Sequence, residues 1–310
     1  MKMPDPFALT VGPVQYHWPR QVMLSFYADM AESPAHTIVL GEAVCARRRE
    51  LKAADWLALA RDLKAAGKEV ALVTQTLVES EADLRALRRL AEQRDFMVEV
   101  GDASALQVMT GVVPFVLGPH INIYNRAALA EHARLGAVRW VAPVELSLDA
   151  LALINPPQDP VTTVAGLTME TEVLAFGRLP LAFSARCFTA RHYKLSKDEC
   201  EFRCLEHPDG LLLSSSEGAP FLVLNGTQTQ SAAQQCLIGD AAALREAGVS
   251  RLRLSPCAWQ FREVLDWFDG VMNHDVLVAE ALPALQAMAL PGGLSNGFAH
   301  GRPGMEWRGV

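Results

Sequence analysis

The spacing of cysteines is the feature of this 310-residue sequence that most directly indicates chemistry. Cys200 and Cys204 are separated by three residues, Cys187 precedes that pair with twelve residues between, and Cys45 stands alone, five residues beyond the strand-like run TIVL. Four thiolates can hold an iron–sulfur cluster or a tetrahedral zinc ion, because both prefer soft sulfur ligands and form bonds that offset the entropy lost in ordering a loop. The spacing predicts a metal site but does not separate the two metals.

Plain burial is the alternative explanation for these cysteines, since free cysteine is among the most buried residue types. Against it, the segment RCFTARHYKLSKDECEFRC places arginine, lysine and histidine around three of them, a composition unsuited to an apolar core and suited to lowering the pKa of a thiol. Cys236, in the helix-like pattern QSAAQQCLIGDAAALREAG, and Cys257, in SPCAW, lack this environment. We expect those two to be structural.

Charged residues next to Cys45 are further candidates for the site. Arg47, Arg48 and Arg49 follow it closely, and a guanidinium there could bind the carboxylate of a small organic acid, with Arg47 as the candidate. Glu42 could support a metal ligand or transfer a proton. The alternatives are a solvated start of the next helix for the arginines and an ordinary surface position near a helix start for Glu42.

Polar residues also follow a later strand-like run, in the segment LGPHINIYNRAAL. His120, Asn122 and Asn125 stand where a barrel keeps its working residues, and they could form hydrogen bonds with an aromatic substrate. The alternative, that they cap the helix that begins next, is equally open.

The chain alternates between short β-rich runs and amphipathic stretches, such as those at 54–68 and 79–94. This alternation is typical of parallel strands joined by crossover helices. We therefore predict the α/β class and an imperfect, TIM-like (β/α) barrel. The predicted strands are 8–14, 37–40, 69–74, 96–100, 114–118, 137–143, 171–184 and 251–256.

We predict one barrel domain over residues 1–310 with two appendages. A cysteine-rich insertion at about 185–225 ends in LLLSSSEGAPFLVLN, where two apolar runs flanking a turn indicate a β-hairpin. A Gly/Pro-rich tail from residue 290 is either a frayed end or a loop packed on the site. Because loops after the carboxyl ends of barrel strands converge, Cys45 and Cys187 should meet at one mouth.

Charge and hydropathy narrow the function classes. The formal charge of -7 argues against a nucleic-acid or anionic-membrane surface, which needs concentrated lysine and arginine. No uncharged apolar stretch reaches the ~18 to 20 residues of a spanning helix, so we expect no transmembrane segment. The sequence favours a cytoplasmic protein with small-molecule or protein partners.

Four segments of the sequence resemble the collagenase-like peptidase family of barrels. These segments are LGEAVCARRRE, RLPLAFSARCFTARHYKLSKDECEFRC, FLVLNGTQTQSA and the tail LSNGFAHGRPGM. The chain nevertheless lacks a G-x-S-x-G elbow and an H-E-x-x-H pair, and thiolates committed to a metal are not free nucleophiles. We therefore do not expect a peptidase.

The resemblance implies a 4Fe-4S protein with Cys45, Cys187, Cys200 and Cys204 as ligands. It further implies a heterodimer with a UbiU-like sister protein and a role in the oxygen-independent hydroxylation of a prenylated aromatic ring in ubiquinone biosynthesis. Two alternatives remain. One is a binding or assembly subunit whose metal is structural. The other is an RNA-modifying relative, for which the acidic balance gives no electrostatic footprint.

Overall fold

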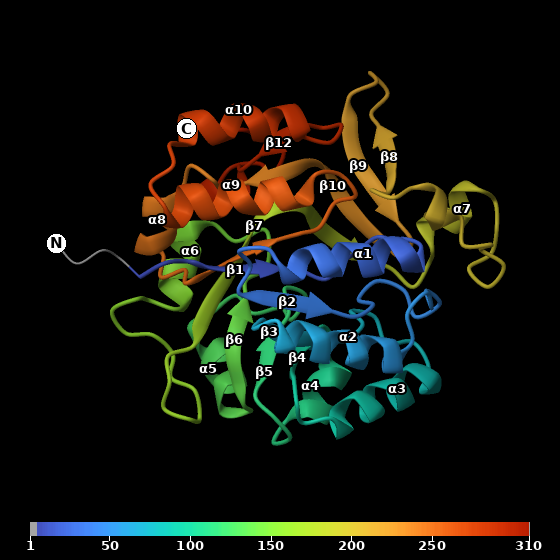
Figure 1. The fold of residues 1–310 in the computed structure, drawn as a ribbon, viewed down its shortest axis with the longest axis horizontal. Coiled ribbons are helices and arrows are strands. Elements are labelled where there is room, and N and C mark those ends of the chain that lie inside the picture. Colours follow the sequence, from blue (N-terminus) through green and yellow to red (C-terminus); the bar gives the residue numbers. More distant parts are fainter. Residues whose placement is uncertain (1–4, 310) are drawn as a thin grey trace.

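Eight parallel strands close into a barrel in the computed structural model, which describes residues 5–309 (Figure 1). Closure comes from the last barrel strand, which pairs with both the first and the seventh. The prediction of a TIM-like barrel is confirmed, and the ring is complete where we expected an imperfect one. Its strands are β1 (Ala8–Val11), β2 (Thr37–Leu40), β3 (Glu69–Val73), β4 (Met97–Val100), β5 (Phe115–Leu117), β6 (Ala137–Val141), β7 (Glu170–Phe183) and β11 (Arg251–Leu254).

Helices cover the outside of the ring and follow from local sequence signals. Ser80 caps its helix by accepting a hydrogen bond from the backbone N–H of Asp83. Phe261, Val264 and Phe268 recur at helical spacing and are buried against the barrel. The helices are α1 (Arg20–Ala31), α2 (Ala53–Ala65), α3 (Glu81–Glu92), α4 (Ala103–Met109), α5 (Arg126–Arg134), α6 (Leu148–Ile154), α8 (Ala241–Glu246), α9 (Phe261–Asn273) and α10 (Val278–Met288).

A cysteine-rich insertion and a small antiparallel sheet stand between β7 and β11. Strand β7 continues beyond the barrel, and its carboxyl-terminal half pairs antiparallel with β10 (Gln228–Cys236). The predicted hairpin is present as β8 (Leu211–Ser214) and β9 (Pro220–Asn225), which projects from the body near α7 (Phe188–His192) (Figure 1). A short 3-10 helix, η1 (Arg203–Glu206), completes the insertion.

The helix predicted over 230–248 is wrong in its first half. That half forms β10, so Cys236 lies on a strand, and only α8 is helical. Pairing with both β7 and β9 supplies long-range backbone hydrogen bonds that override the local pattern.

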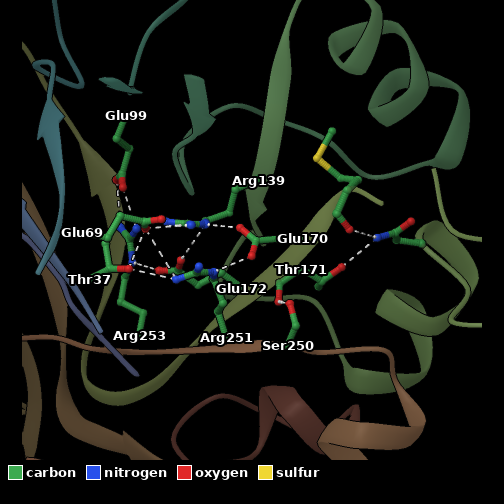
Figure 2. A network of polar contacts seen from close by, with 12 residues as sticks. Thr37, Glu69, Glu99, Arg139, Glu170, Thr171, Glu172, Ser250, Arg251 and Arg253 are labelled. Atoms are coloured by element: carbon green, nitrogen blue, oxygen red, sulfur yellow. Dashed lines mark hydrogen bonds and ion pairs between the residues drawn. The ribbon is translucent and has the colours of Figure 1, made fainter. Parts of the chain in front are cut away.

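Charged side chains fill part of the barrel interior (Figure 2). Arg253 donates to Glu172 at 2.6 Å and to Glu99 at 2.8 Å, and all three side chains are buried. Arg139 donates to Glu69 and to Glu170, each at 2.8 Å. Buried charges are tolerated only when paired and hydrogen-bonded, which this network achieves.

The carboxyl-terminal tail is ordered rather than frayed. Strand β12 (Leu294–Ser295) pairs with β10, and a second 3-10 helix, η2 (Phe298–His300), follows it. Asn296 is buried, and its side chain accepts from the backbone N–H of Arg308 at 2.7 Å. Within residues 5–309 no helix combines the length and the apolar character needed to cross a bilayer.

Candidate metal centre and barrel-mouth pocket

Four cysteine side chains from three segments of the chain line one small enclosed space, which we call the thiol site. Cys45 comes from the loop after β2, Cys187 directly precedes α7, and Cys200 and Cys204 flank the start of η1. All four are free thiols, and no aspartate or glutamate lines this space. A donor set of thiols alone is the one that soft metals and iron–sulfur clusters prefer.

Hydrogen bonds hold the loop that carries Cys45. Glu42 accepts from the backbone N–H groups of Val44 at 2.9 Å and Cys45 at 3.0 Å. Thr227, in the turn between β9 and β10, donates its hydroxyl to the Val44 carbonyl at 2.7 Å. The loop after β2 is thereby fastened to the small sheet, although 183 positions separate these two residues in the sequence.

The other thiols are positioned by the insertion and by the loop after β1. The backbone N–H of Ala190 donates to the Cys187 sulfur at 3.4 Å, and His17 Nδ1 lies 3.3 Å from the Cys204 sulfur. Glu201 and Phe202 both adopt left-handed backbone, with φ of 51° and 52°. Non-glycine residues seldom adopt this conformation, and it gives the sharp turn that brings Cys200 and Cys204 to the same space.

The composition of the insertion predicts thiols with a lowered pKa, but two of the four thiols have a raised one. Burial raises the pKa of Cys45 and of Cys204, and it outweighs the lowering by the nearby Arg48 guanidinium. Two basic residues of the insertion direct their charges elsewhere, since Arg203 pairs with glutamates and Lys197 with Glu79. Cys45 and Cys204 are therefore protonated near neutral pH, and a metal would have to displace their protons.

Within the described part of the chain, no three histidine, cysteine, aspartate or glutamate side chains are grouped so that they could hold a single metal ion.

The two remaining cysteines, Cys236 and Cys257, differ from the four at the thiol site. Burial raises the pKa of Cys236 and of Cys257 to about 12, and the Cys257 thiol donates to the Trp259 carbonyl at 3.2 Å.

The structure also places Arg47 and Glu42 beside the thiol site. Arg47 lines it and donates to the Asp198 carboxylate at 3.0 Å and to the Asp198 carbonyl at 2.7 Å, so it ties the Cys45 loop to the insertion. Glu42 is 3.7 Å from the Arg48 guanidinium, and burial raises the pKa of its carboxyl. Of the three consecutive arginines, Arg48 is the one that is buried.

A larger pocket of about 480 Å³ opens at the same mouth of the barrel. Loops after β3 to β6 and the carboxyl end of β7 form it. His120 lines this mouth pocket and packs edge-on against Phe183, with ring centroids 4.7 Å apart. Burial, with a smaller effect of Arg253, lowers the pKa of His120 to about 4, so its ring is neutral at physiological pH.

The two asparagines predicted with His120 are placed differently. Asn122 lines the mouth pocket. Asn125 caps α5 instead, accepting from the backbone N–H of Ala128 at 2.8 Å. The structure thus brings His120 and Asn122 together and leaves Asn125 outside the pocket lining.

Charge in the mouth pocket is carried by carboxylates alone. Asp102 and Glu145 line it, no lysine or arginine does, and the Tyr124 hydroxyl donates to Glu145. The remaining lining combines polar side chains such as Asn122 with apolar ones such as Leu106 and Phe183. Such a pocket favours an uncharged ring over an anion. Sequence reasoning missed Asp102, Tyr124 and Glu145, although each follows a predicted strand.

The thiol site and the mouth pocket are linked through the backbone. The N–H of Thr76, which lines the pocket, donates to the carbonyl of Ala43 at 3.0 Å, two residues before Cys45. Phe183 precedes Cys187 by four residues. A parallel barrel collects its functional groups at the carboxyl ends of its strands, and both sites obey that rule.

These features define a TIM-like α/β barrel protein with a thiol-lined insertion at the carboxyl-terminal face of its strands. Residues 25–308 match peptidase family U32, and the chain belongs to that family.

Three solved structures are similar in fold. The U32 peptidase Mk0906 has 12% identity and a TM-score of 0.42, over 83% of this chain and 95% of its own. The spore cortex-lytic enzyme SleL of Bacillus megaterium QM B1551 has 11% identity and a TM-score of 0.41, over 86% of this chain and 74% of its own. Dihydropteroate synthase of Burkholderia cenocepacia, complexed with 7,8-dihydropteroate, has 12% identity and a TM-score of 0.38, over 91% of this chain and 93% of its own. At this similarity none of them bears on the chemistry of this chain.

Proposed function

We propose that this chain is a cytoplasmic 4Fe-4S protein that acts with a UbiU-like partner in the oxygen-independent hydroxylation of the aromatic ring in ubiquinone biosynthesis. Its cysteine segments resemble those of the ubiquinone biosynthesis protein UbiV, which supports this proposal. One observation carries the proposal. Cys45, Cys187, Cys200 and Cys204 line a single space beside a pocket suited to a ring.

The four thiols would hold the cluster, which when bound supplies one-electron chemistry at the barrel mouth. Glu42 keeps the Cys45 loop in place through the backbone, and His17 and Arg48 stand next to Cys204. His17 and Arg48 give the ligands a polar neighbour and a positive charge, which are among the protein's means of tuning such a centre.

The mouth pocket would hold the ring of the substrate. Phe183 offers an aromatic face, and the neutral His120 can form a hydrogen bond with a ring hydroxyl. Because Asp102 and Glu145 are the charged groups of its lining, the pocket would disfavour a ring that bears a carboxylate. The chain would thus act as one subunit of an oxygen-independent hydroxylase.

A second candidate is a subunit whose metal is only structural. The part of the insertion that precedes β8 has little regular structure, since α7 spans five residues and η1 four. A metal could therefore provide its folding energy, as in closed four-cysteine zinc sites, although the thiols would have to move closer together to hold a single ion. An RNA-modifying role is less well supported, because a pocket lined by carboxylates and a net charge of -7 repel phosphates.

The proposed role is tested in a bacterial strain that lacks this protein and makes ubiquinone without oxygen only when the protein is supplied. Wild type and Cys236→Ser should restore anaerobic ubiquinone, and Cys187→Ser should not. Growth of the same strains with oxygen controls for general defects. Wild-type ubiquinone levels with Cys187→Ser would contradict the proposal.

A further inference from the structure

A buried arginine stands beside the thiol site. Arg48 is 5% exposed, its Nη1 donates to the Gln15 carbonyl at 2.6 Å, and its Nη2 donates to the Asn225 side-chain oxygen at 2.7 Å. Its Nε is buried and has no hydrogen-bond partner in the described part of the chain. A guanidinium donor without a partner is costly inside a protein, so its retention here points to a group that the site receives.

The thiols lie within the reach of its charge. The backbone N–H of Arg48 donates to the Cys45 carbonyl at 3.0 Å, which places the arginine directly behind this thiol. Arg48 also lines the thiol site. It is therefore placed to act on the ligands electrostatically.

Other charges around the thiol site are compensated or exposed. Arg47 and Arg203 also line it, but Arg47 pairs with Asp198, and Arg203 is 39% exposed and pairs with two glutamates. His17 is buried beside Cys204, and its Nε2 lies 3.7 Å from the Glu50 carboxylate. Glu42, 3.7 Å from Arg48, is the carboxylate that opposes the buried charge.

The surrounding chain is shaped to hold this guanidinium in place. Gly226 lies in the turn between β9 and β10 with φ of 64°, and a Cβ there would stand 3.0 Å from Arg48 Nη2. Asn225, the residue before it, accepts from the same nitrogen. Glycine allows the left-handed turn and leaves the room that the arginine fills.

We propose that Arg48 is the counter-charge of the thiol site and sets the reduction potential of its cluster, with Glu42 acting in the opposite direction. This inference rests on the proposed function, which provides the cluster. Four thiolates bring a negative charge into a buried space, and reduction adds one more. A fixed positive charge nearby stabilises the reduced state most and therefore raises the potential.

The test is an anaerobic redox titration at pH 8 of the cluster-loaded chain, followed by EPR. Relative to wild type, Arg48→Gln should lower the ratio of reduced to oxidised cluster at a given potential at least tenfold, which is about 59 mV for one electron. Glu42→Gln should shift the ratio the opposite way. Arg48→Lys keeps the charge and should stay within threefold of wild type, as should the control Arg49→Gln, which replaces the exposed neighbouring arginine.

A cluster in Arg48→Gln with the potential of Arg49→Gln would overturn the inference. If Arg48→Gln keeps the wild-type circular dichroism but loses its iron while Arg49→Gln stays loaded, Glu42→Gln decides, as it does for a variant that does not fold. If Arg48→Gln does not fold, Glu42→Gln decides: an upward shift supports the inference, and no shift or a downward one overturns it. A wild type without iron would overturn the proposed function as well.

Discussion

The Glu42 carboxylate accepts a hydrogen bond from the backbone N–H of Cys45 at 3.0 Å. The same oxygen accepts from Val44 and lies 3.7 Å from the buried Arg48 guanidinium. The Glu42 side chain therefore fixes the turn that positions the Cys45 thiol, and it compensates the charge of Arg48. The geometry of the thiol site depends on this residue even before a metal binds.

Replacing Glu42 with alanine should destabilise the metal-free chain. It leaves two backbone N–H groups without their acceptor and Arg48 without its carboxylate, and the loss should be about 3 kcal/mol. Urea unfolding followed by circular dichroism measures it. Glu92→Ala, at an exposed position near the end of α3, should stay within about 0.5 kcal/mol of wild type. Equal losses in the two variants would refute the role of Glu42.

Replacing Arg253 with methionine should be among the most destabilising changes in the barrel. Glu99 and Glu172 would remain buried without their partner, at a cost of about 3 to 5 kcal/mol. Arg126→Met is the matched control, since its pair with Asp159 lies at the surface and is worth about 0 to 1 kcal/mol. A loss below that of the control would show that the interior network is not stabilised by pairing.

The partly buried His120 predicts a dependence of stability on pH. Its pKa in the folded chain is about 4, below the ordinary 6.5, so the unfolded chain binds more protons between these values. Stability should therefore rise with pH across this window and be lost as pH falls through it. His120→Gln should remove about 2 kcal/mol of the loss between pH 7 and pH 5.

Urea unfolding at both pH values measures this effect. His17 also has a lowered pKa, so part of the dependence of stability on pH should remain in His120→Gln. The control His274→Gln replaces a side chain that is 67% exposed and should keep the wild-type slope. An unchanged slope in His120→Gln would mean that His120 is not buried in its neutral form.

Asn122 and Asn125 should separate binding from stability. Asn125→Ala removes the cap of α5 and should cost about 1 kcal/mol of stability without changing the affinity of the mouth pocket. Asn122→Ala, in the pocket lining, should weaken binding in the mouth pocket without changing stability. Calorimetric titration with a neutral alkylphenol, beside chemical unfolding, distinguishes the two. Weaker binding in Asn125→Ala alone would reverse the assignment.

The barrel could be predicted because each of its strands combines an apolar run with a following helical pattern. Strand β10 could not, since its buried residues are largely polar. Gln228 and Gln230 are fully buried, and Gln230 donates to the Gln15 side chain 215 positions away. The interior ion network could have been predicted from the sequence. Charged residues occupy every second position in ETEV and RLRL, which places them on one face of their strands.

At the site, cysteine spacing and loop convergence predicted which thiols come together. The sequence could not show which of three consecutive arginines turns inward. Arg48 does so because its backbone N–H donates to the Cys45 carbonyl at 3.0 Å, closing a turn that depends on the rest of the loop. The lining of the mouth pocket depends in the same way on where four loops and the end of β7 meet.

The most direct test of the central claim is the metal content of the chain purified without oxygen, measured as iron, sulfide and zinc beside visible and EPR spectra. Wild type and Cys257→Ser should hold about four irons and four sulfides, and Cys45→Ser and Cys187→Ser should lose them. Stoichiometric zinc without sulfide in the wild type would contradict the cluster and assign the thiol site a structural metal.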